Sequence, residues 1–457
     1  MRFLPIVVGA LALVGCSSSS SETSLTKDAG GGDASRDAGT DAGVDAAPVI
    51  ANCDGGSCIE HLVVLVQENH TFDDHFGGYC TAPPGSNPTC TTGPSCCEAM
   101  PAKDPAGNNA VALTDELHAS FDPNHTEACE TTEIDDGKMD GYVNGDGGAG
   151  CTSVDNVAIA DPMIIKPYWD LAASNALADR YFQPVVGQSS SNDMFLAVAT
   201  FLFLDDTVAP LGAVGMTCDI EGSPKQYSNT TIGDLLTAAS VPWTWFSDGY
   251  AAMVASKPSC PPQPADCAFP FPFYPCAFDP SDVPFEYFAS TVDNPDTMKD
   301  YSAFTAALSG GTLPAVSFIK AIGYKQEHPG NECTLSAGVA FGTSVVQAVE
   351  SSPYAASTLV LVTYDEGGGY FDHVAPPPAN TLDGKPYGTR VPLLAVGPFV
   401  KTNSVSHVVM EHSSIVKFIE WNFLGQKTGQ LGNRDTIVNN IGSLLDPTKT
   451  GITVPAQ

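Results

Sequence analysis

The chain has 457 residues, and its 52 acidic side chains against 19 Lys plus Arg give a formal net charge of −33. This charge argues against nucleic acid or an anionic membrane surface as a partner. With so few basic side chains, an anionic substrate would have to be held largely by metal, histidine and backbone N–H groups.

Residues 1–16 have the pattern of a lipoprotein signal peptide. A basic start, Met1-Arg2, precedes an apolar run, and Leu13-Val14-Gly15-Cys16 matches a lipoprotein cleavage box. The apolar run is too short to span a bilayer. We therefore expect export and a lipid on Cys16. Because Ser17 is not an aspartate-type retention signal, we expect an anchor to the outer membrane or the cell surface.

Residues 17–52 are rich in Ser, Gly, Ala and Asp, a composition that cannot bury enough apolar surface to fold. We expect this segment to be a disordered tether. The remaining residues, 53–457, show no internal repeat and fit one large α/β catalytic domain with inserted loops.

Removing Cys16 from the fourteen cysteines leaves thirteen, and disulfides are the default in an exported chain. Two clusters lie in proline-rich segments and lack the paired C-x-x-C spacing of a zinc site. They consist of Cys80, Cys90, Cys96 and Cys97, and of Cys260, Cys267 and Cys276. We expect disulfides to hold these loops and one thiol to stay unpaired, but the sequence does not give the pairing.

Two apolar strands are each followed directly by polar side chains. Ile59–Val66 leads into Glu68 and Asn69, and Leu359–Val362 leads into Asp365-Glu366 and three glycines. Open α/β sheets bind their ligands at the carboxyl ends of strands. Adjacent buried carboxylates repel each other, so a divalent cation between them is the simplest interpretation. The alternatives are a glycine-rich turn whose acids face water, and a helix cap at Glu68-Asn69.

A glycine turn followed by a helix start is predicted at Gly187-Gln188-Ser189-Ser190-Ser191, before the apolar run Met194–Thr200. A hydroxyl there would lie in the positive field of a helix N-terminus, which suits a phosphate or an alkoxide. The alternative is that these serines are ordinary N-caps. The stretch is not a G-x-S-x-G elbow, because Ser191 stands where the second glycine should be.

Further strands and helices alternate along the chain, which predicts a mostly parallel central sheet flanked by helices. The strands are expected near Val241–Phe246, Ala315–Ile319 and Val391–Val396, and the helices near Pro162–Phe182, Thr231–Ala239, Gly338–Val349 and Ser413–Phe423. The aromatic, proline-rich span Lys257–Pro284 is expected to be an insertion near the mouth of the site.

Taken in order, the motifs resemble the phosphoesterase family of bacteria and plants, which includes phospholipases C and a group of acid phosphatases. Gln67–Gly77 resembles the family's E-N-R-S-F-D-H-x-F-G, Gly137–Tyr142 its G-K-M-D-G-F, and Asp365–Val374 its D-E-x-G-G-F-x-D-H-V. Glu327-His328-Pro329 is similar to its E-H-P.

This resemblance implies an alkaline-phosphatase-like α/β fold and metal-assisted hydrolysis of a phosphoric ester through a phosphoserine. The implied metal ligands are Glu68, Asn69, Asp365 and Glu366, for a divalent ion of unknown identity. Ser189 would be the nucleophile, and Asn192 and Asp372 would contact the substrate. Phosphate binding or protonation of the leaving oxygen would fall to His125, His328 and His373.

The chain departs from the family pattern at two places. His70-Thr71 replaces Arg-Ser, and Ser191 and Asp193 replace the Pro and Arg that often flank Asn192. The loss of two arginines leaves the substrate head group open. We predict a phospholipase C-like enzyme acting on a phosphate ester or phospholipid. The alternatives are an acid phosphatase or sulfatase-like enzyme on the same scaffold, and a catalytically silent surface-binding lipoprotein.

Overall fold

The computed structural model describes residues 53, 56–145, 150–203, 208–218, 223–267 and 274–457. The predicted signal peptide, its Cys16 and the predicted tether lie outside these residues. Within the part that is described, no helix is both long and apolar enough to cross a membrane.

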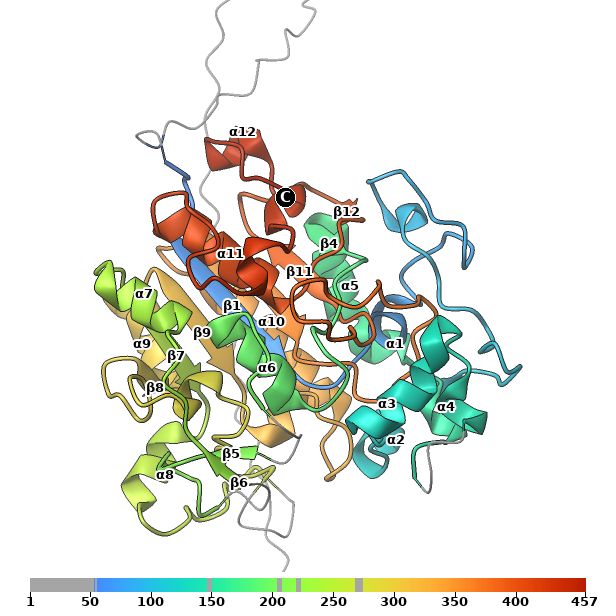
Figure 1. Ribbon diagram of the computed structural model, residues 1–457, viewed down its shortest axis with the longest axis horizontal. Helices are drawn as coiled ribbons and strands as arrows, with labels where there is room; N and C mark the ends of the chain where they lie inside the picture. The colour runs from blue at the N-terminus through green and yellow to red at the C-terminus, as the bar shows by residue number, and fades with distance from the viewer. Residues whose placement is uncertain (1–52, 54–55, 146–149, 204–207, 219–222, 268–273) are drawn as a thin grey trace, which may run out of the picture. The chain divides into compact units, whose positions relative to one another are not determined.

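An eight-stranded mixed sheet forms the centre of the fold, in the order β12-β4-β11-β10-β1-β9-β7-β8 (Figure 1). Its strands are β1 (His61–Gln67), β4 (Ala176–Ala178), β7 (Trp243–Ser247), β8 (Met298–Asp300), β9 (Val316–Lys320), β10 (Thr358–Tyr364), β11 (Leu393–Val396) and β12 (Ser404–Ser406). Neighbouring strands are parallel except where β11 pairs with β10 and β4. The predicted mostly parallel sheet is confirmed.

Strands β1 and β10 are paired in register from His61 opposite Thr358 to Gln67 opposite Tyr364. Every residue of β10 is buried, as is every residue of β1 except His61. This burial explains their uninterrupted apolar sequences, because both faces of the strands are covered. The two strands therefore end side by side at the same edge of the sheet.

Helices flank the sheet in two groups. In one group α6 (Ser189–Val198), α7 (Ile232–Ala238) and α11 (His412–Phe423) pack together, nearer the viewer in Figure 1. In the other, α10 (Leu335–Glu350) packs against α5 (Pro162–Ser174) and α9 (Tyr301–Gly310). The smaller elements are α1 (Phe72–Phe76), α2 (Asp115–Ser120), α3 (Glu127–Ile134), α4 (Gly141–Asn144), α8 (Tyr250–Ser256), α12 (Pro447–Thr450), β2 (Val111–Leu113), β3 (Ala158–Ala160), β5 (Val208–Pro210) and β6 (Ser223–Lys225).

The helix predicted over Pro162–Phe182 is too long. Helix α5 ends at Ser174, and the buried Ala176–Ala178 forms strand β4 between β11 and β12. Three small apolar residues carry no periodicity that would separate a strand from a continuing helix.

Six disulfides hold the inserted loops, as predicted. They join Cys53 to Cys58, Cys80 to Cys97, Cys90 to Cys96, Cys129 to Cys151, Cys218 to Cys260, and Cys267 to Cys276. Among the described cysteines the unpaired thiol is Cys333, which is buried.

Candidate active site

Three neighbouring parallel strands bring charged side chains to one edge of the sheet. Glu68 follows β1, Asp365 follows β10, and Lys320 is the last residue of β9. All three are almost completely buried. The Lys320 ammonium lies 2.7 Å from Glu68 Oε1 and 3.6 Å from Asp365 Oδ2, so it sits between the two carboxylates.

The predicted nucleophile meets this cluster. Ser189 is the first residue of α6, and its Oγ donates to Asn69 Oδ1 at 3.4 Å. The Ser189 hydroxyl also interacts with the Asp365 carboxylate and lowers its pKa slightly. The loop that presents Ser189 is held by Asn192, whose Oδ1 accepts from the Val185 N–H at 3.1 Å and whose Nδ2 donates to the Gly187 carbonyl at 2.8 Å. Asn192 therefore shapes the turn before α6.

Two buried carboxylate oxygens beside Ser189, Asp365 Oδ2 and Glu366 Oε1, have no hydrogen-bond partner. Burial raises the pKa of Asp365 to about 6, because the attraction of Lys320 only partly offsets it. Burial, with the nearby Glu130 and Asp365, raises the pKa of Glu366 well above its usual range. Their raised pKa values show that neighbouring positive groups compensate these buried carboxyls only in part, and together with Asn69 Oδ1 they offer the oxygen ligands that a divalent cation takes.

Glu68 differs from the other predicted metal ligands. Burial alone would raise its pKa, but the Lys320 ammonium, aided by His328, outweighs it and lowers the pKa. Glu68 is therefore already compensated by a lysine. Among the described residues, three groups of Asp, Glu, His or Cys side chains have potential ligand atoms that all lie within 4.8 Å of one another: His70, Asp74 and His75; Asp122, His125 and His328; and Asp73, Asp372 and His373. The predicted ligands Glu68, Asp365 and Glu366 do not form such a group.

Two predicted histidines border the same site. His125 Nε2 lies 3.4 Å from Asn69 Nδ2 and 3.7 Å from Glu366 Oε1, and its ring centre is 5.7 Å from that of His328. Burial alone would lower the pKa of His328, but the carboxylates of Asp122 and Glu68 outweigh it and raise the pKa. A protonated imidazole at this site can bind a phosphoryl oxygen or protonate a leaving group.

Residues 59–424 match the Phosphoesterase family. The chain belongs to that family. It is 25% identical over 417 residues to the non-hemolytic phospholipase C of Pseudomonas aeruginosa. The aligned residues cover 80% of this chain but only 54% of that relative. The chain thus spans about half the length of that protein.

Other phosphoesterase relatives align over more of their length. The phospholipase C A of Mycobacterium tuberculosis is 24% identical over 459 residues, covering 88% of this chain and 81% of the relative. For the non-specific phospholipase C3 of Arabidopsis thaliana the identity is 23% over 448 residues, with 86% and 76% covered. An alkaline phosphatase superfamily structure from Vibrio parahaemolyticus aligns at 11% identity over 87% of this chain and 73% of its own, with a TM-score of 0.36.

His373 and Asp372 lie in a different network of this phosphoesterase. His373 Nδ1 contacts Asp73 Oδ2 at 2.7 Å, and its Nε2 contacts Glu98 Oε2 at 2.9 Å. Asp372 accepts from Arg390 Nε at 2.9 Å. Both side chains form ion pairs within this network, and among the described contacts none joins them to Ser189. The catalytic role predicted for His373 and the substrate contact predicted for Asp372 gain no support from this geometry.

Sequence reasoning missed two residues of the site. Lys320 could have been noticed as a lysine that ends a strand whose other residues, apart from Ser317, are apolar, in a chain with few cations. Glu130, on α3, accepts from the Gly187 N–H at 2.7 Å and interacts with Glu366. No local pattern marks Glu130, since its partners lie far away in the sequence.

Proposed function

We propose that this phosphoesterase hydrolyses phosphoric esters in the manner of a phospholipase C, with Ser189 as nucleophile. The observation that carries the proposal is the Ser189 hydroxyl, which is buried at a helix N-terminus, donates to Asn69 Oδ1 and interacts with the Asp365 carboxylate, whose Oδ2 has no hydrogen-bond donor. The relatives named as phospholipases C support this substrate class.

Each step of the proposed hydrolysis is assigned to a side chain of the site. Ser189 Oγ gives its proton to solvent water and attacks phosphorus in line, so that a new P–O bond forms while the bond to the departing alcohol breaks. His125 or His328 gives a proton to that alcohol. The same histidine then takes a proton from the water that hydrolyses the phosphoserine, which releases phosphate and frees Ser189. A divalent cation held by Asn69, Asp365 and Glu366 would supply charge neutralisation for the phosphoryl group and a lower pKa for the serine hydroxyl.

We further propose that the enzyme is exported and held at the outer membrane or cell surface by a lipid on Cys16. The cleavage-box sequence Leu13-Val14-Gly15-Cys16 supports this anchor, and six disulfides fit an oxidising compartment.

Turnover of phosphatidylcholine and of p-nitrophenyl phosphate, before and after chelation, tests the function. We expect diester turnover that chelation abolishes and a divalent ion restores. Ser189→Ala should lower it by about a thousandfold or more, because the covalent step is lost, whereas Ser190→Ala should cost about tenfold or less.

Four outcomes would change the proposal. Full turnover by protein shown to be metal-free would remove the cation. Near-normal turnover by Ser189→Ala would remove the nucleophile. Turnover of p-nitrophenyl phosphate alone would indicate a phosphomonoesterase, and no turnover of either compound would leave a silent surface lipoprotein.

A further inference from the structure

The buried carboxylate of Glu327, the residue before His328, accepts four hydrogen bonds. Oε1 accepts from Gln67 Nε2 at 2.8 Å and from the Tyr168 hydroxyl at 2.6 Å. Oε2 accepts from the Tyr364 hydroxyl at 2.6 Å and from His75 Nε2 at 3.0 Å. All of these side chains are buried. Glu327 therefore gathers donors from β1, α1, α5 and β10 onto a single group.

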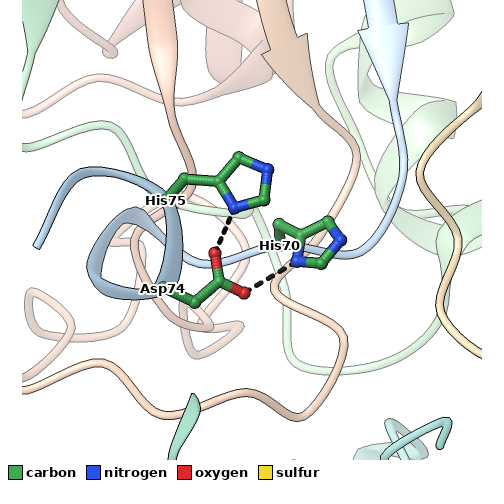
Figure 2. A group of neighbouring side chains, drawn as sticks. All are labelled: His70, Asp74 and His75. Atoms are coloured by element: carbon green, nitrogen blue, oxygen red, sulfur yellow. Dashed lines mark hydrogen bonds and ion pairs between the residues drawn. The ribbon is translucent and has the colours of Figure 1, made fainter. Parts of the chain in front are cut away.

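A second carboxylate extends this network. Figure 2 shows Asp74 between two imidazoles, with Oδ1 2.5 Å from His75 Nδ1 and Oδ2 2.7 Å from His70 Nδ1. His70 Nε2 in turn lies 2.9 Å from the Glu327 carbonyl oxygen. These ligand atoms are close enough for a metal, but each already has a hydrogen-bond partner. We therefore interpret the group as a hydrogen-bonded network.

Four residues of the network directly adjoin site residues in the sequence. Gln67 precedes Glu68, Tyr364 precedes Asp365, Glu327 precedes His328, and His70 follows Asn69. Asn69 and Glu327 both have a positive φ, 66° and 72°. Residues other than glycine keep this conformation only where the surrounding structure holds them.

We propose that Glu327 is a positioning residue of the phosphoesterase site. By fixing Gln67, Tyr364 and its own backbone, its carboxylate sets the spacing of Glu68, Asp365 and His328. Gln67, Glu327 and Tyr364 come from segments about 260 and 37 residues apart, so no local turn could set this spacing. The inference rests on the proposed function, because it concerns the same site.

Two matched pairs of variants test the proposal. Glu327→Gln keeps the shape of the side chain but replaces one acceptor oxygen with a donor group, and Glu332→Gln changes an exposed glutamate of the same loop. Tyr364→Phe removes one hydroxyl from Glu327. Tyr354→Phe removes a hydroxyl that accepts from the Leu313 N–H at 3.1 Å, near the opposite ends of the strands.

For each variant we would measure the melting temperature, kcat and KM on p-nitrophenyl phosphate and phosphatidylcholine, and the affinity for Mn²⁺ by calorimetry. Loss of an outer hydrogen-bond partner typically costs about 10–100-fold in metal affinity or activity. We expect losses of this size in kcat and Mn²⁺ affinity for Glu327→Gln and smaller losses for Tyr364→Phe, while Glu332→Gln and Tyr354→Phe keep wild-type values.

A purely structural network gives a different result. The melting temperatures of Glu327→Gln and Tyr364→Phe would fall while kcat and Mn²⁺ affinity stayed at wild-type values, and this would overturn the proposal. If Glu327→Gln does not fold, the milder Tyr364→Phe decides. A wild-type protein that turns over neither ester would refute the proposed function alone, and the Mn²⁺ affinities would still decide the role of Glu327. A wild-type protein without turnover or Mn²⁺ binding would overturn both.

Discussion

Lys320 neutralises buried carboxylates of the candidate site. Its ammonium contacts Glu68 at 2.7 Å, Asp193 at 3.3 Å and Asp365 at 3.6 Å, and it is 3% exposed. Arg390 is likewise buried, against Asp73 and Asp372. Neither group is free to bind a substrate phosphate. That metal, histidine and backbone N–H groups hold an anionic substrate remains a prediction.

Replacing Lys320 with methionine should lower the stability of the folded protein. Without the ammonium, Glu68 and Asp193 remain as uncompensated buried carboxylates, which typically costs about 3–5 kcal/mol of stability. The proposed metal site exists only in the folded state, so added Mn²⁺ should raise the melting temperature of Lys320→Met more than that of the wild type. Lys325→Met, at a partly exposed lysine paired with Asp248, should change stability by about 1 kcal/mol or less. Equal stability of Lys320→Met and the wild type without metal would contradict this account.

The sequence singled out candidate site residues at the strand ends, but it did not reveal which distant residues they contact. Asp365 and Asn69 stand directly after apolar strands, and Ser189 stands at a helix start, so each could be singled out locally. Lys320 and Glu130 act through partners far away in the sequence, and only the folded chain shows these contacts. The separate network of His373 was hidden for the same reason.

At the scale of elements, long apolar strands were predictable and three-residue strands were not. Strands β1, β9 and β10 lie within a few residues of their predicted positions, because their burial on both faces leaves a strong signal. Strands β4 and β12 have three residues each and are defined by neighbours instead of by a pattern. Helix α1 is similarly short, yet all five of its residues are buried.

Helix α1 should make stability depend on pH through His75. Burial alone would lower the pKa of His75, but Asp74 and Glu327 outweigh it and raise the pKa to about 9. A raised folded-state pKa gives stability that is fully present below the unfolded value, about 6.5, and is lost as pH rises through about 9. The loss should be about 3 kcal/mol at most.

Urea unfolding of the wild type and His75→Gln at pH 6 and pH 9.5 measures this contribution. Other groups titrate in the same interval, so the relevant quantity is the difference in unfolding free energy between the two proteins. That difference should shrink as pH rises. A difference that stays constant over the interval would show that His75 is not held as an imidazolium.

At the scale of the whole molecule, the negative net charge makes membrane residence depend on the proposed lipid anchor. A chain with a formal charge of −33 has no electrostatic attraction to anionic lipid. Residence at a membrane would therefore depend on a covalent lipid. A single acyl chain binds only marginally, whereas two or more signals give stable anchoring.

Replacing Cys16 with serine should block lipidation and leave the precursor unprocessed at its cleavage box. The disulfide-bonded domain is built from other cysteines, so mass spectrometry of non-reduced peptides should still find all six pairs. Metabolic labelling with a radioactive fatty acid provides the measurement. Cys333→Ser, which removes the buried unpaired thiol, is the matched control and should keep the label. Label retained in Cys16→Ser would place the lipid on another residue, and loss of label in both variants would point to a general export defect.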